Sequence, residues 1–166
     1  MCALSLSGVQ NMADNSADRD DVIDVLQDLA ECSKDGEYGF RACAEQADRA
    51  DLKAMFLQRA ADCRNAVAEL NEHIRSMGGN ITEHGSAAAA IHRGWVAVKT
   101  TLTTYDDKAV LEECERGEDN AKARYMNALK KPLPAAVQLI VERQYQGVLR
   151  NHEQIKSLRD QFRATA

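Results

Sequence analysis

The sequence contains little proline and few aromatic residues. Its only two prolines lie together in the segment KKPLP at residues 130–134, so the rest of the chain permits long uninterrupted helices. Aromatic residues make up 5% of the chain, whereas hydrophobic residues make up 45%. Because strands favour aromatic and β-branched side chains, this balance predicts closely packed helices rather than a sheet.

The chain also has no excess of positive charge and no long apolar run. Its net charge of −5 argues against a nucleic-acid partner, since neutralising phosphates requires a basic surface. No segment approaches the roughly 20 consecutive apolar residues of a membrane span. The first residues lack the basic and long apolar regions of a secretion signal. We therefore expect a soluble, cytoplasmic protein without a membrane partner.

The cysteines form no CxxC pair, and their number is odd. Small buried thiols in a reducing cytoplasm are favoured over disulfides or a metal-thiolate site. The five cysteines are Cys2, Cys32, Cys43, Cys63 and Cys114.

Apolar residues recur at spacings of three and four along most of the chain, which is typical of amphipathic helices. The predicted helices span residues 18–47, 50–77, 107–131 and 133–163, with a shorter helix over 86–103 in the central connection. Two tight hairpins joined by a longer connection predict an all-α four-helix bundle with a crossover. We expect one domain over residues 18–164, preceded by a disordered tail over 1–17, with translation beginning at Met1 or Met12.

Several acids fall on the apolar side of these helices. If the hairpins turn near Asp48–Arg49 and Pro132, Glu37 lies level with Asp62 and Glu118 lies opposite the Glu142–Tyr145 region. Each leading acid follows a glycine, Gly36 or Gly117, although a glycine inside a helix costs about 1 kcal/mol relative to alanine. Close approach of a neighbouring helix, or room beside the acid for a partner group or ion, would explain these glycines, and close approach is our interpretation at Gly117.

Three phrases carry a resemblance to a known family: KDGEYGF at residues 34–40, IHRGW at 91–95 and CERGED at 114–119. They resemble a bacterial family of the ferritin-like superfamily that is catalogued only as a domain of unknown function. The similarity covers the chain from about Val22 to Leu158. It implies a ferritin-like fold. It implies no activity, because none is established for the family.

Ferritin-like di-iron proteins use a Glu on helices one and three and a Glu-x-x-His on helices two and four. Glu37 and Glu118 match the single-Glu positions. The second helix offers Asp62-x-x-Asn65 and the fourth Glu142-x-x-Tyr145, so both histidines are missing. The candidate metal ligands for iron or manganese are Glu37, Asp62, Glu118 and Glu142, with Tyr145 and His152 as further candidates.

The competing interpretation is a structural one, and the missing nitrogen ligands favour it. A buried acid needs a partner in any case, so these carboxylates would bond to Arg59, Tyr125, Tyr145 or water. The other acids of the CERGED region are expected to face water. They are Glu112, Glu113, Glu115 and Asp119.

No nucleophile–base pair or phosphate-binding loop is present, so no catalytic residue or bound cofactor is expected. We predict a non-catalytic helical bundle that acts by association with itself, most simply as a homodimer, or with another protein, with a role in stress as one possible context. The alternative is a metal-dependent ferritin-like oxidoreductase or iron-handling protein.

Overall fold

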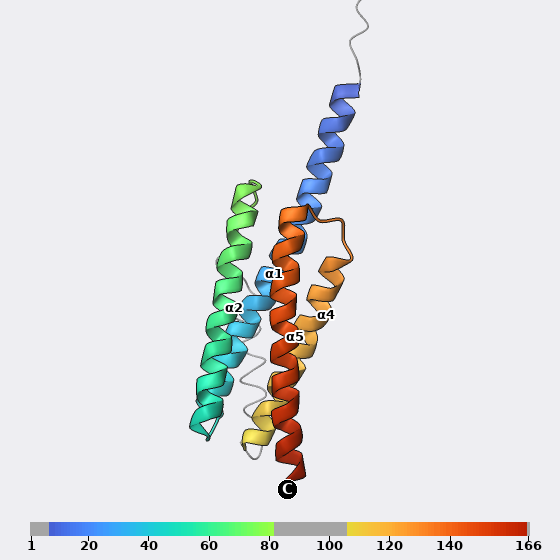
Figure 1. Ribbon diagram of the computed structural model, residues 1–166. Helices are drawn as coiled ribbons and strands as arrows, with labels where there is room; N and C mark the ends of the chain where they lie inside the picture. The colour runs from blue at the N-terminus through green and yellow to red at the C-terminus, as the bar shows by residue number, and fades with distance from the viewer. Residues whose placement is uncertain (1–6, 82–105, 166) are drawn as a thin grey trace, which may run out of the picture.

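The computed structural model describes residues 7–81 and 106–165, and within these ranges the secondary structure is helical, with no strand (Figure 1). The helices are α1 (Ser7–Gln46), α2 (Ala50–Ser76), α4 (Asp107–Leu129) and α5 (Ala135–Ala164). They confirm the prediction of an all-α four-helix bundle. The short helix predicted over residues 86–103 lies outside the described residues.

Helix α1 begins at Ser7, well before the start near Asp18 that the sequence analysis predicts. Residues 7–17 are thus part of α1. A physical reason is that this segment contains no proline, and extending an existing helix is easier than nucleating one. The N-terminal part of α1 projects beyond the ends of the other helices (Figure 1).

The four helices form two antiparallel hairpins, α1 with α2 and α4 with α5 (Figure 1). α2 ends at one end of the bundle and α4 begins at the other, as predicted for hairpins joined by a crossover. The buried carboxylate of Asp107, the first residue of α4, joins the two hairpins. Its oxygens accept hydrogen bonds from the backbone N–H groups of Asp48 (2.7 Å) and Arg49 (3.2 Å) in the α1–α2 turn.

The core consists of two apolar clusters. One contains Val22, Ile23, Leu26, Leu29, Ala30, Leu70, Ile74, Tyr125, Ala128, Val137 and Val141. The other contains Phe40, Cys43, Ala44, Ala47, Leu52, Phe56, Ala60, Val110, Leu111, Cys114 and Ile155. Between them, each helix contributes a stretch that belongs to neither cluster and carries polar side chains, with glycines on α1, α4 and α5. The candidate site lies in this middle layer.

None of the helices within residues 7–81 and 106–165 is long and apolar enough to cross a membrane.

Candidate functional site

A cavity of about 900 Å³ lies in the middle layer, and all four helices line it. Its polar lining includes three arginines, four carboxyl groups and four thiols. The residues that the argument below uses are Gly36, Arg59, Asp62, Gly117, Glu118 and Gln154.

Glu118 is the buried acid of this cavity, with a relative exposure of 4%. Its Oε2 atom has no hydrogen-bond partner among the described residues. Burial raises the pKa of Glu118 to about 7, the attraction of Arg59 works against that increase, and the nearby charge of Asp119 adds to it. The sequence analysis therefore placed Glu118 correctly in the interior, and near neutral pH a large fraction of this carboxyl is protonated.

Arg59 connects α2 to α5 across the cavity. Its Nη1 atom lies 3.1 Å from Asp62 Oδ2, and its Nη2 atom donates to Gln154 Oε1 at 2.6 Å. The third guanidinium nitrogen, Nε, is buried, and its N–H has no hydrogen-bond partner among the described residues. Arg59 thus supplies positive charge to Asp62 by direct pairing and to Glu118 at longer range.

The two glycines beside the acids have different surroundings. A Cβ atom at Gly36 would lie 3.0 Å from Cys63 Sγ, so this glycine permits the close approach of α1 and α2. Among the described residues, a Cβ atom at Gly117 would meet nothing within 4 Å. None of the four described helices therefore comes close to Gly117 as predicted, and this glycine lines the cavity instead.

Four cysteines line the cavity, and all four are free thiols. Cys114 Sγ donates to Cys43 Sγ at 2.7 Å, which joins α4 to α1. Burial raises the pKa of Cys32 to about 12 and also raises the pKa values of Cys63 and Cys114. Since the thiolate is the nucleophile and the metal ligand, these thiols are poorly suited to either role.

A polar network at the other side of the cavity links all four helices. The hydroxyl of Tyr125 shares a hydrogen bond of 3.1 Å with Ser33 Oγ and donates to Gln144 Oε1 at 2.9 Å. Gln144 in turn donates to Glu69 Oε2 at 2.7 Å. Tyr125 therefore bonds to neutral side chains and not to the acids for which the sequence analysis considered it.

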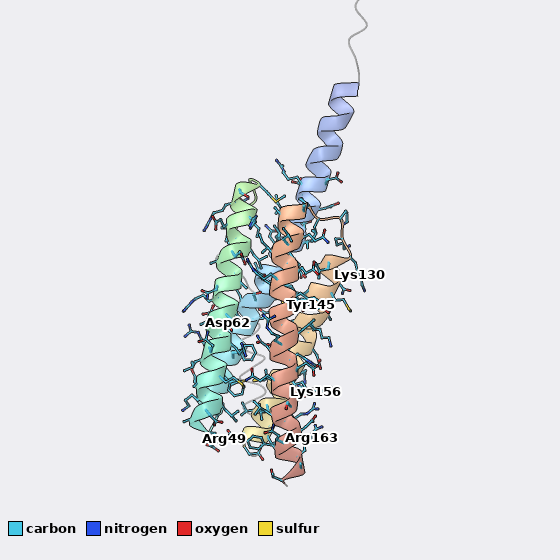
Figure 2. All side chains as sticks on the ribbon, in the orientation of Figure 1. Arg49, Asp62, Lys130, Tyr145, Lys156 and Arg163 are labelled. Atoms are coloured by element: carbon cyan, nitrogen blue, oxygen red, sulfur yellow. The ribbon has the colours of Figure 1, made fainter. Side chains whose placement is uncertain are left out.

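The other predicted metal ligands do not gather around Glu118. Glu37 pairs with Arg41 of its own helix at 3.0 Å, and only Glu118 and Asp62 of the six candidates line the cavity. Glu142 is exposed, which corrects the prediction that it faces inward. Asp62 and Tyr145 lie on α2 and α5 (Figure 2), and Tyr145 packs against the first apolar cluster.

The cause of this difference is the register of the α4–α5 hairpin. Asp119 contacts His152, so Glu118 lies at the level of His152 to Gln154 and not at that of Glu142. The non-helical connection between Leu129 and Ala135 explains the shift. An extended chain advances about 3.3 Å per residue, whereas a helix rises 1.5 Å, so a few extended residues displace α5 by several helical positions.

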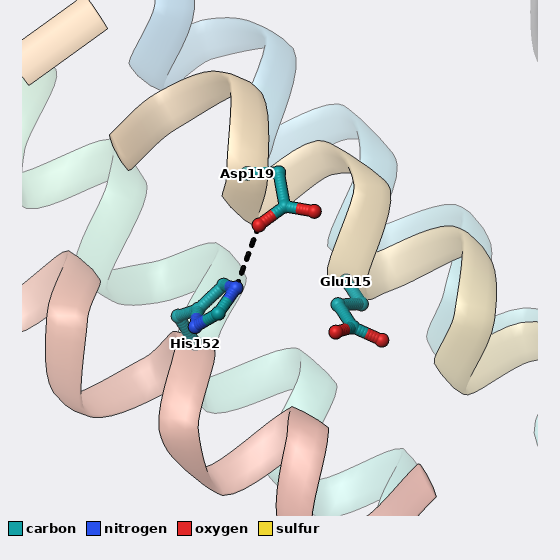
Figure 3. A group of neighbouring side chains, drawn as sticks. All are labelled: Glu115, Asp119 and His152. Atoms are coloured by element: carbon teal, nitrogen blue, oxygen red, sulfur yellow. Dashed lines mark hydrogen bonds and ion pairs between the residues drawn. The ribbon is translucent and has the colours of Figure 1, made fainter. Parts of the chain in front are cut away.

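A second group of metal-binding side chains lies between α4 and α5, and it was not predicted as a site. Glu115 and Asp119 come from α4 and His152 comes from α5 (Figure 3). One ligand atom of each lies within 4.8 Å of the others. Asp119 is exposed as expected, but the Glu115 side chain is only 13% exposed and pairs with Arg159, so the expectation that Glu115 faces water is wrong.

Comparison with known proteins places the chain in a family. The model of a domain of unknown function, DUF2383, matches residues 21–131. The chain belongs to the DUF2383 family. A comparison with curated protein sequences finds no match.

The DUF2383 chain is also similar in structure to two solved ferritin-like proteins. One is a two-domain protein from Anabaena variabilis ATCC 29413 containing DJ-1/ThiJ/PfpI-like and ferritin-like domains (TM-score 0.69, 16% identity). The match covers 86% of this chain and 40% of that one. The other is a ferritin-like, diiron-carboxylate protein from Bacillus anthracis str. Ames (TM-score 0.66, 16% identity), covering 86% of this chain and 97% of that one. At this identity the similarity establishes the ferritin-like fold alone.

A di-iron centre does not fit the residues at the level of Glu118. Glu37 and Asp62 already pair with arginines, and Glu142 is exposed. The described side chains that line the cavity include no histidine. The unpaired Oε2 atom of Glu118 is one available acceptor, but a single carboxyl with a raised pKa is a poor ligand set for two iron ions.

Proposed function

We propose that this DUF2383 protein is a non-catalytic ferritin-like bundle that acts by association with itself or with another protein. The observation that supports this most is Arg59, which lines the cavity together with Asp62 and Glu118. Its guanidinium provides these acids with the positive charge that a metal ion provides in a di-iron protein. A fixed cation of this kind carries out no redox chemistry.

The carboxylate chemistry of the cavity supports the same proposal. Burial raises the pKa of Glu118 to about 7, so an ion that binds this carboxyl near neutral pH has to displace part of its protons. The polar bridges of Arg59 and Gln144 connect α2 to α5, two helices that have few other contacts. These groups therefore contribute to holding the bundle together, which is a structural role.

Self-association as a homodimer is part of the proposal. Near the α4–α5 turn, Met126 is 42% exposed and Leu139 is 71% exposed. Leu57, near the start of α2, is also exposed but lies outside this patch. Burying such side chains in a two-fold interface would be favourable. Sedimentation of the full-length protein tests this, with Leu139→Gln expected to weaken the dimer and Leu57→Gln as the control on another helix. A strict monomer at high concentration would contradict it.

The second candidate is a carboxylate metal site that supports iron handling or oxidation, and the unpaired Glu118 Oε2 atom is the observation that favours it. Anaerobic addition of Fe(II) or Mn(II), followed by thermal unfolding and by oxygen consumption, separates the two candidates. For the non-catalytic bundle, we expect no oxygen consumption and no increase in Tm that depends on Glu37 or Glu118. An increase that both Glu37→Gln and Glu118→Gln abolish would establish the metal site instead.

A further inference from the structure

The group between α4 and α5 has the composition and spacing of a mononuclear metal site. Glu115 and Asp119 are four residues apart, so their carboxylates lie on the same face of α4. His152 projects from α5 toward them, and its Nε2 atom lies 2.7 Å from Asp119 Oδ1 (Figure 3). All three ligand atoms lie within 4.8 Å of one another.

The burial of His152 distinguishes this group from a cluster of surface acids. The residue is 7% exposed, and its Nδ1 atom is buried without a hydrogen-bond partner. The Glu153 Oε1 atom lies 3.4 Å from Nδ1 without a hydrogen bond between them. A metal-bound histidine usually donates its second ring N–H to a carboxylate. Binding of an ion at Nε2 would place the proton on Nδ1, where Glu153 can accept it after a small side-chain rotation.

Arg159 of α5 holds the side chain of the third ligand, Glu115. It pairs with Glu115 through Oε2 and also with Asp160, so it restricts where the Glu115 carboxylate can move. Because a carboxylate has two oxygens, Glu115 can keep this contact and still present Oε1 to an ion. The arginine also offsets part of the negative charge that accumulates when Glu115 and Asp119 lie together.

We propose that Glu115, Asp119 and His152 bind one divalent transition-metal ion, preferentially Zn²⁺, between α4 and α5. An imidazole with two carboxylates suits Zn²⁺, whereas Ca²⁺ and Mg²⁺ prefer oxygen ligands alone. Zn²⁺ bonds of about 2.0–2.2 Å place neighbouring ligand atoms about 3.4 Å apart in a tetrahedron, so modest side-chain movements would complete the site. Water supplies the fourth ligand, and the ion joins the two helices.

The test uses full-length, reduced, metal-stripped protein and calorimetric titration with ZnCl₂. We expect one high-affinity ion per chain and a higher Tm when it is bound. Asp119→Asn and His152→Gln should each weaken binding by about tenfold or more, because each removes a ligand. Glu112→Gln is the matched control. It removes one charge from the same pair of helices, where Glu112 pairs with Arg163, and should leave Zn²⁺ affinity unchanged.

Co²⁺ identifies the ligands independently of affinity. A site of nitrogen and oxygen ligands gives d–d absorption without the thiolate-to-cobalt charge transfer that cysteine ligands produce. A charge-transfer band, or Zn²⁺ binding that survives Asp119→Asn, would overturn the proposal. Asp119 is exposed, so this variant should fold even if His152→Gln does not.

The same titration separates this inference from the proposed function. Glu118→Gln should leave Zn²⁺ affinity unchanged, since Glu118 lines the cavity and not the group between α4 and α5. Binding lost in Asp119→Asn but kept in Glu118→Gln supports the site whatever the iron experiment gives. The reverse pattern would overturn it and would favour a metal centre in the cavity.

Discussion

Asp107 and Glu118 are both buried carboxyl residues of α4, and the protein treats them in opposite ways. Asp107, at the start of the helix, accepts two backbone N–H groups from the α1–α2 turn. Glu118, in the middle of the helix, borders a cavity and leaves one oxygen without a partner. Two similarly buried carboxyl groups therefore have different roles. The Asp107 carboxylate connects the hairpins, whereas for Glu118 protonation relieves the cost of burying a charge.

Replacing Asp107 should have the largest effect on stability. Asp107→Ala removes the acceptor of the Asp48 and Arg49 N–H groups, and hydrogen bonds to a charged group contribute about 1.5–3 kcal/mol each. We expect the free energy of unfolding to fall by about 3 kcal/mol in urea denaturation, allowing for partial hydration of the exposed N–H groups. Asp106→Ala is the control, since it removes only a helix cap and should cost about 1 kcal/mol. Equal losses would mean that the link between the hairpins contributes nothing.

Glu118→Gln should act in the opposite direction. The folded-state pKa of about 7 lies above the ordinary value of 4.5, so the folded protein binds more protons between these pH values. The contribution of Glu118 to stability is therefore fully present below about pH 4.5 and is lost as the pH rises to about 7. At 1.36 kcal/mol per pKa unit the loss is at most about 3 kcal/mol, and after relaxation we expect about 2.

The measurement is the free energy of unfolding of wild type and Glu118→Gln at pH 5 and at pH 8. The variant should be more stable than wild type at pH 8, and the difference should shrink toward pH 5. Asp35, whose pKa burial raises to about 6, titrates in the same direction in both proteins, so the difference between them isolates Glu118. A variant that is less stable at pH 8 would show that the ionised carboxylate is held by a partner or an ion.

The sequence predicts features that depend on neighbouring residues better than features that depend on how separate helices are placed. Helical periodicity is local, so the four described helices, apart from the earlier start of α1, and the interior position of Glu118 were predicted correctly. The turn between α1 and α2 is short, so the prediction that Glu37 and Asp62 lie at the same height in the hairpin also follows from the sequence. The proximity of Gly36 to Cys63, the neighbours of these two acids, agrees with that prediction. The α4–α5 register was missed because five residues of non-helical chain displace one helix along the other.

The group of Glu115, Asp119 and His152 could not be predicted for the same reason. A correct register would have placed His152 at the level of Asp119, but the facing direction also depends on how each helix is rotated about its axis. That rotation is fixed by packing across the whole hairpin, and periodicity determines it only to about one residue. The pairing of Arg59 with Asp62 agrees with the sequence analysis, whereas the hydrogen bond from Arg59 to Gln154 depends on the packing of α2 against α5.

The two glycines beside the acids provide the smallest and most local test. Gly117→Ala adds a methyl group where a Cβ atom meets none of the described residues within 4 Å, so it should stabilise the helix by about 0.5–1 kcal/mol without strain. Gly36→Ala gains the same helix propensity, but its Cβ atom lies 3.0 Å from Cys63 Sγ, so the Cys63 side chain has to move away. We expect this variant to be destabilised relative to wild type in the same urea experiment, and Cys63→Ala should restore it. If Gly117→Ala is also destabilising, the space beside Glu118 is occupied in the native protein, and the contrast between a filled contact at Gly36 and an open cavity at Gly117 is wrong.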